Sequence, residues 1–130
     1  MASELQLLQE EEIGGFASVI ASLLLIFSSL RGQEYIYYKE EDITPPNRPP
    51  SSGELALDSS LVFILVAYIF TATSYTRYDQ RRNNTPEGQG KEYAFPEGVV
   101  FIGSLIILIG YIILAEGTKL EIDRDQPVVI

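Results

Sequence analysis

The side chains that most often carry enzyme chemistry are absent from this 130-residue chain or stand apart from one another. The chain has no His and no Cys, so it lacks the commonest general base, the thiolate nucleophile and the commonest zinc ligands. The hydroxyls of Ser28 and Ser74 have no His and no membrane-embedded Lys to activate them. The acidic run 40–42 is typical of a hydrated surface. We therefore expect no enzyme, no catalytic residue, no metal site and no cofactor.

The charged side chains are distributed very unevenly. The chain carries 9 basic and 18 acidic residues, a net charge of −9, which argues against nucleic acid as a partner. None of these charges falls in 13–30, 59–76 or 98–115, three windows of 18 residues each. Eighteen helical residues span about 27 Å, close to the hydrocarbon thickness of a bilayer. The sequence therefore predicts an all-α membrane protein with three transmembrane helices and the lipid bilayer as a partner.

A short amphipathic lead helix is expected before the first window. Residues 2–12 hold four Glu and no basic residue, unlike a secretory signal peptide. Ser3 and Gln6 have the spacing of a capping box. Leu5 and Leu8 share one face, which would rest on the membrane interface or on a neighbouring helix. The alternative is a solvated lead-in that continues directly into the first span.

Turn-forming and charged residues divide the chain into seven predicted segments. These are an acidic N-terminal helix 1–12, a transmembrane helix with an aqueous extension 13–39, a Pro-rich linker 40–53, a second such helix 54–82, a loop 83–95, a third transmembrane helix 96–116 and a polar tail 117–130. Ser51 and Glu54 predict a second capping box. Pro96 is typical of a first helical turn, and Gly117 of a C-terminal cap.

Small residues in the first and third windows predict helix-packing faces. In the first window Gly14, Ser18 and Ser22 lie four apart, and in the third Gly103 and Gly110 lie seven apart, with Gly117 continuing the step. In lipid, helices associate where small residues let their backbones approach closely. The alternative is that glycine is simply tolerated, because it is frequent in membrane helices. If the faces are real, the partner is a second copy or a larger membrane complex.

Tyrosines at the end of an uncharged window or just beyond it predict aromatic belts at the bilayer surface. They are Tyr35, Tyr37, Tyr38, Tyr75 and Tyr78. The second window is the least apolar, with eight Ile, Val, Leu and Phe residues against twelve in the third. At roughly −0.3 to −0.6 kcal/mol for each such residue, the second helix is the one that most needs partners for stable insertion.

The basic residues give a weak indication of orientation. Three spans place four Lys and Arg residues on the side of the N-terminus and five on the other side. Arg77, Arg81 and Arg82 are concentrated next to a span end, which favours a cytoplasmic N-terminus. We expect a multipass protein of a bacterial cell membrane with this orientation.

Two classes of function remain open. One is a non-enzymatic interaction or accessory subunit, which the small-residue faces favour. The other is an oligomeric pore former or holin-like permeability protein, which the small size and the hydroxyl-rich end of the second window favour. A small-solute carrier ranks last, because coupled carriers usually hold a membrane-embedded charge and none of the three windows contains one.

Overall fold

The described part of the chain is helical almost throughout. The computed structural model describes residues 3–44, 51–84 and 90–125. They form α1 (Glu4–Glu40), α2 (Ser52–Asn83), the short α3 (Gly90–Tyr93) and α4 (Phe95–Asp125). Three of these helices, α1, α2 and α4, are long and apolar enough to cross a membrane. The predicted all-helical class with three helices of this kind is confirmed.

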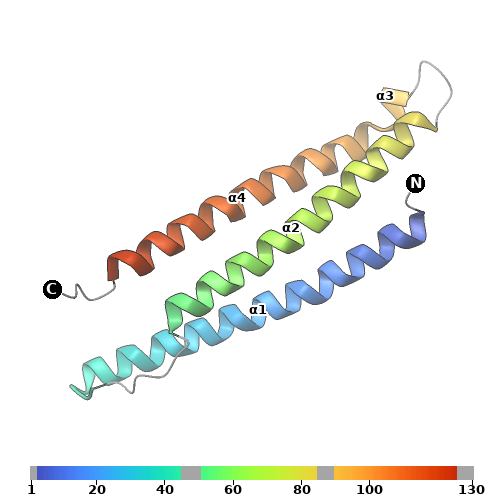
Figure 1. Ribbon diagram of the computed structural model, residues 1–130. Helices are drawn as coiled ribbons and strands as arrows, with labels where there is room; N and C mark the ends of the chain where they lie inside the picture. The colour runs from blue at the N-terminus through green and yellow to red at the C-terminus, as the bar shows by residue number, and fades with distance from the viewer. Residues whose placement is uncertain (1–2, 45–50, 85–89, 126–130) are drawn as a thin grey trace.

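The three long helices lie side by side in a row with α2 in the middle (Figure 1). The chain reverses direction after α1 and again after α2, so α2 runs antiparallel to its neighbours, whereas α1 and α4 run parallel. Helix α2 packs against both, and among the described residues α1 and α4 make no contact with each other. Helices α1 and α4 therefore each have a neighbour from the chain on one side only.

Both predicted capping boxes are present. The hydroxyl of Ser3 accepts a hydrogen bond from the Gln6 amide at 3.1 Å, and the Gln6 side chain accepts one from the Ser3 amide at 2.9 Å. Ser51 and Glu54 make the same pair of bonds at the start of α2, at 3.2 and 3.1 Å. Because these bonds satisfy amides that have no partner inside the helix, they define where α1 and α2 begin.

The lead segment is the first part of α1 and not a separate helix. Helix α1 runs without interruption from Glu4 to Glu40, as the alternative of a continuous lead-in predicts. Leu5 and Leu8 are exposed, so they do not rest on a neighbouring helix of the chain. Leu7 is the buried leucine of this segment, at 1% exposure.

Helix α1 ends close to its predicted boundary. The amide of Asp42 donates to the Lys39 carbonyl at 3.3 Å and that of Ile43 to the Tyr38 carbonyl at 2.9 Å. Asp42 has a φ of 53°, the left-handed conformation that such a helix end requires. The Pro-rich part of the linker, 45–50, lies outside the described residues.

The third long helix extends well past its predicted end. Gly117 was expected to cap it, but α4 continues to Asp125, and the predicted polar tail is helical as far as that residue. Glycine inside a helix costs about 1 kcal/mol relative to alanine, which a new contact can offset. Ile122 supplies one, because its Cγ1 would be 2.9 Å from a Cβ atom built on Gly53 of α2. The predicted loop 83–95 also contains the one-turn helix α3.

Candidate functional site: the helix-packing faces

The face that α1 turns toward α2 repeats at every seventh residue. Its buried residues are Leu7, Gly14, Ala21 and Ser28. A step of seven residues drifts by only about 20° around a helix, so these positions form one nearly straight stripe. Three of the four side chains are small, which lets α2 approach closely. A Cβ atom on Gly14 would already be 3.1 Å from the ring of Phe70.

Hydroxyl groups connect this stripe to α2. Ser59 donates to the Ala21 carbonyl at 2.7 Å. Further along, Ser28 donates to the Ser52 carbonyl and Ser52 to the Ser28 carbonyl, both at 2.8 Å. Interhelical hydrogen bonds of this kind contribute about 0.6–2 kcal/mol each in a membrane. The α1–α2 contact is therefore small-residue packing reinforced by hydrogen bonds to backbone carbonyls.

Helix α2 has a second small-residue stripe next to the first. The stripe toward α1 consists of Ser52, Ser59, Val66 and Thr73, and the residue after each of them gives a second stripe of Gly53, Ser60, Ala67 and Ser74. Neighbouring residues point about 100° apart on a helix, so the second stripe faces another direction. Gly53 in that stripe contacts Ile122 of α4.

Aromatic rings complete the α2–α4 contact. The rings of Phe63 and Tyr111 are stacked, with centroids 5.2 Å apart and planes 6° apart. The rings of Tyr75 and Phe101 lie 5.3 Å apart. Ala94 and Ala115 of this region are buried. Phe101, Ala115 and Ile122 of α4 lie at multiples of seven residues, so α4 also meets α2 through a heptad stripe.

The paired stripes on α2 are the packing residues that our sequence analysis missed. The visible signal was a pair of adjacent residues that recurs every seven positions: 52–53, 59–60, 66–67 and 73–74. All eight of these residues are Gly, Ala, Ser, Thr or Val, none larger than valine. Two adjacent stripes on one helix predict two neighbours, so this pattern marks α2 as the central helix.

The predicted packing residues of α1 have different environments. Gly14 is buried against α2, Ser18 is half-buried and donates to the Gly14 carbonyl at 3.0 Å, and Ser22 is exposed. A step of four residues turns the stripe by about 40° around the helix. After two such steps the position has left the contact with α2. The contact within the chain follows the seven-residue step instead.

The three predicted glycines of α4 have no neighbour among the residues that the structure describes. A Cβ atom built on Gly103, Gly110 or Gly117 would meet no atom within 4 Å. Each of these glycines comes two residues after a position of the heptad stripe of α4 that faces α2. Two residues correspond to a rotation of about 200° around the helix. The glycine stripe therefore lies on the side of α4 that α2 does not cover, and packing through it remains a prediction about another chain.

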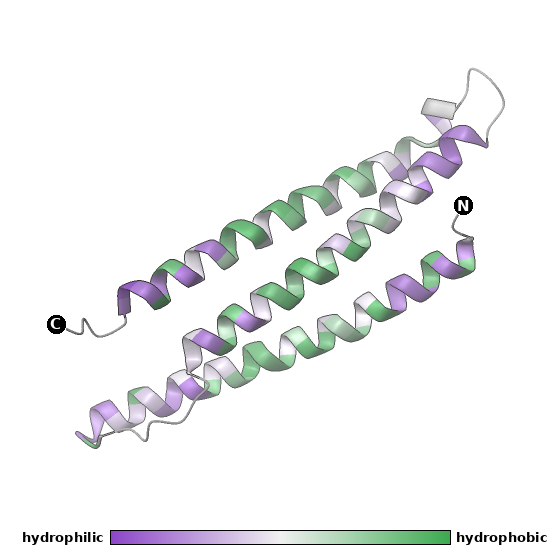
Figure 2. Ribbon diagram, viewed as in Figure 1, coloured by the Kyte–Doolittle hydropathy of each residue, from purple (hydrophilic) through white to green (hydrophobic). Residues whose placement is uncertain are grey.

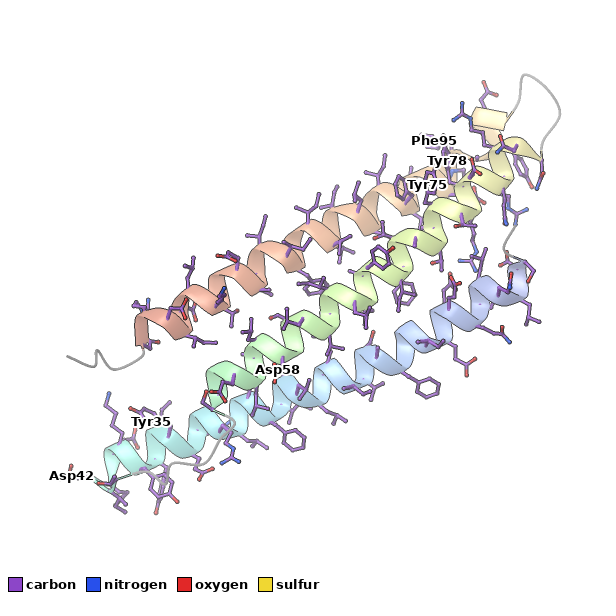
Figure 3. The ribbon with its side chains drawn as sticks, viewed as in Figure 1. Tyr35, Asp42, Asp58, Tyr75, Tyr78 and Phe95 are labelled. Carbon is purple, nitrogen blue, oxygen red and sulfur yellow. The ribbon has the colours of Figure 1, made fainter. Side chains whose placement is uncertain are left out.

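The predicted interfacial tyrosines lie at opposite ends of the row (Figure 3). Tyr35 and Tyr37 are exposed on the part of α1 that extends past the start of α2, and Tyr38 is beside Tyr37 with ring centroids 5.8 Å apart. At the other end, Tyr75 contacts Phe101, and the Tyr78 ring would be 3.1 Å from a Cβ atom on Gly98. This placement is compatible with one belt at each bilayer surface, which stays a prediction.

Ion pairs connect the helices at the end that holds the N-terminus. Arg77 of α2 bonds to Glu11 of α1 and, at 3.1 Å, to Glu4. The hydrogen bond to Glu11 is the main cause that raises the pKa of the Arg77 guanidinium above its ordinary value. Arg81 and Glu97 form a second pair, between α2 and α4, at 3.6 Å. Both neighbours of α2 are thus also held by charge.

The described residues contain no group of three or more Asp, Glu, His or Cys side chains placed to hold a metal ion. Comparison with protein-family models, with curated proteins and with solved structures finds no match. The fold and the packing faces define the class of protein: a small all-helical chain with three helices of membrane-spanning length and composition.

Proposed function

We propose that this chain is a non-enzymatic interaction or accessory subunit of a membrane complex, and that it packs through the glycine stripe of α4. The observation that carries the proposal is the exposure of α4. Only 6% of its most apolar window is buried within the chain, against 33% for α2. The open side of α4 includes Gly103, Gly110 and Gly117.

The chemistry of lipid supports a second copy or a larger complex as the occupant of this stripe. Lipid chains are as apolar as leucine, so apolar burial alone does not bring two membrane helices together. A glycine at every seventh position lets a neighbouring backbone approach along the whole helix, and the gain comes from van der Waals contact. The stripe is therefore suited to another helix more than to lipid.

Replacing Gly110 by Leu tests the proposal. Because no atom of the described residues lies within 4 Å of a Cβ atom built on Gly110, the larger side chain should fit the isolated chain without strain. We expect loss of at least half of the oligomer or complex that crosslinking captures in native membranes, with unchanged helix content. Gly15→Leu on α1 is the matched control, since that glycine is equally open and lies on another helix.

Two results would contradict the proposal. Crosslinking of the unaltered protein that returns only monomer would remove the need for a packing stripe. Equal assembly of the Gly110→Leu variant and the unaltered protein would show that the stripe is not the contact. Equal losses in Gly110→Leu and Gly15→Leu would also contradict a role specific to α4.

We prefer the interaction subunit to the pore-forming alternative because of the position of the α2 hydroxyl groups. A pore would need the hydroxyl groups of α2 on a face that water can reach. Five of them are buried between α2 and its neighbours: Ser59, Ser60, Thr71, Thr73 and Ser74. Because these hydroxyl residues take part in packing within the chain, we retain the interaction subunit.

We further propose that the protein lies in a bacterial cell membrane with its N-terminus in the cytoplasm. The concentration of Arg77, Arg81 and Arg82 at the end of α2 supports this orientation. Alkaline phosphatase fused after residue 45 should be active, and the same reporter fused after residue 88 should be inactive. Fluorescent-protein fusions should show the reverse pattern. Activity from the opposite fusions would overturn the orientation.

A further inference from the structure

The contacts of α2 show which residues of α1 and α4 lie at the same level along the row. Ser52 bonds to Ser28 of α1, and the adjacent Gly53 contacts Ile122 of α4. Ser28 and Ile122 are therefore nearly level. Ser28 lies inside the uncharged window of α1, whereas Ile122 lies seven residues past the last residue of the α4 window.

The same displacement is found further along the helices. Ser59 of α2 bonds to Ala21 of α1. Ser59 is six residues after Gly53 on α2 and Glu116 is six residues before Ile122 on the antiparallel α4, so the contact between Gly53 and Ile122 puts Ser59 level with Glu116. Ala21 is near the middle of the α1 window, and Glu116 is the first charge after the α4 window. Ten residues further, Glu11 of α1 is level with the middle of the α4 window. Figure 2 shows the green stretch of α1 nearer the linker end than that of α4.

Helices that stood upright in a bilayer would place charges in the hydrocarbon. If the α1 window were centred in the bilayer, Asp58 and Glu116 would lie near its middle. If the α4 window were centred, Glu11 and its neighbours would lie there instead. Ionised carboxylates are costly at that depth. A row that leans within its own plane reduces both conflicts, because it brings the α1 window toward the depth of the α2 and α4 windows, which the ring contacts between α2 and α4 place level with each other.

We infer that the bilayer meets a slanted apolar belt on this protein. The belt runs from 13–30 on α1 through 59–76 on α2 to 98–115 on α4, and the three helices lean within the plane of the row. Tilts of 0–40° are ordinary for membrane helices, and packing against neighbouring helices is what determines them. The inference rests on the membrane insertion proposed above. The partner of the slanted belt is the hydrocarbon of the bilayer.

Depth measurements on four single-cysteine variants test the belt. The chain has no native cysteine, so each spin label reports one site. Val19 on α1 is level with Leu114 on α4, and Ile13 on α1 is within one residue of the level of Ile107 on α4. All four side chains are exposed, so the labels should leave the packing intact. The full chain is placed in vesicles of phosphatidylcholine and phosphatidylglycerol, and collisions with oxygen are compared with collisions with a water-soluble nickel chelate.

The leaning and upright arrangements give opposite patterns. In the leaning row, labels at Val19 and Ile107 are deep, and those at Leu114 and Ile13 are shallower by at least about 5 Å, one helical turn. Equal depths for Val19 and Leu114, and for Ile13 and Ile107, would overturn the slanted belt and leave membrane insertion standing. Labels that all collide with the nickel chelate and not with lipid-dissolved oxygen would overturn insertion itself.

Discussion

Replacing Ala21 by Leu is expected to separate α1 from α2. Ala21 is fully buried, at 0% exposure, and its carbonyl accepts the hydrogen bond of Ser59. A leucine there adds three heavy atoms to a contact built from small residues. Overpacking of this kind costs about 1–3 kcal/mol, and loss of the interhelical bond adds about 0.6–2 kcal/mol.

Unfolding in mixed micelles with increasing dodecyl sulfate measures this effect. The matched control is Ile20→Leu, next to Ala21 but 55% exposed, which should leave the free energy of unfolding within about 0.5 kcal/mol of the unaltered protein. A disulfide between Ser28→Cys and Ser52→Cys reports the contact directly. If Ala21→Leu unfolds like the control and the disulfide forms as readily, α1 does not pack on α2 through this stripe.

Replacing Arg77 by Gln is expected to weaken the end of the row that holds the N-terminus. The side chains of Arg77 and Glu11 are 24% and 25% exposed, so their ion pair is only partly screened by water. Hydrogen bonds to charged groups contribute about 1.5–3 kcal/mol, and partial exposure places the expected loss at about 1–2 kcal/mol. Glu4 is 59% exposed and should matter little.

The same unfolding experiment separates the two carboxylates. Glu11→Gln should destabilise the protein nearly as much as Arg77→Gln, and the double variant should add little, whereas Glu4→Gln should stay within about 0.5 kcal/mol. Because the bond to Glu11 raises the pKa of Arg77, its contribution is complete below the ordinary pKa of arginine and is lost only as the pH rises through the raised value. Additive losses for Arg77→Gln and Glu11→Gln would contradict their pairing.

Several elements of the fold could be predicted because their causes are local. Absence of charge over 18 residues identifies a span wherever it lies, and the side chains of Ser3 and Ser51 cap the amides three residues away. The end of α4 could not be predicted in this way. Gly117 has the local properties of a cap, but the contact of Ile122 with Gly53, far away in the sequence, extends the helix past it.

The packing faces depend even more on distant contacts. Gly14, Ser18 and Ser22 form a plausible stripe in isolation, and only the position of α2 shows that the seven-residue step is the one used. The glycines of α4 are evenly spaced in the sequence, yet no feature of the neighbouring residues indicates that α2 packs on a different face of α4. Regular spacing identifies a possible face, whereas the partner that covers it depends on the arrangement of all three helices.

In the sequence the three uncharged windows are equivalent segments of 18 residues. The sequence by itself determined their number, their lengths and the places where helices start. The tertiary structure decided that α2 lies between the other two and that the α1 window is displaced along the row relative to the α2 and α4 windows. The physical reason is that hydropathy and capping act within a few residues. Interhelical bonds such as that from Ser59 to Ala21, by contrast, join residues 38 positions apart and so determine how the helices are aligned.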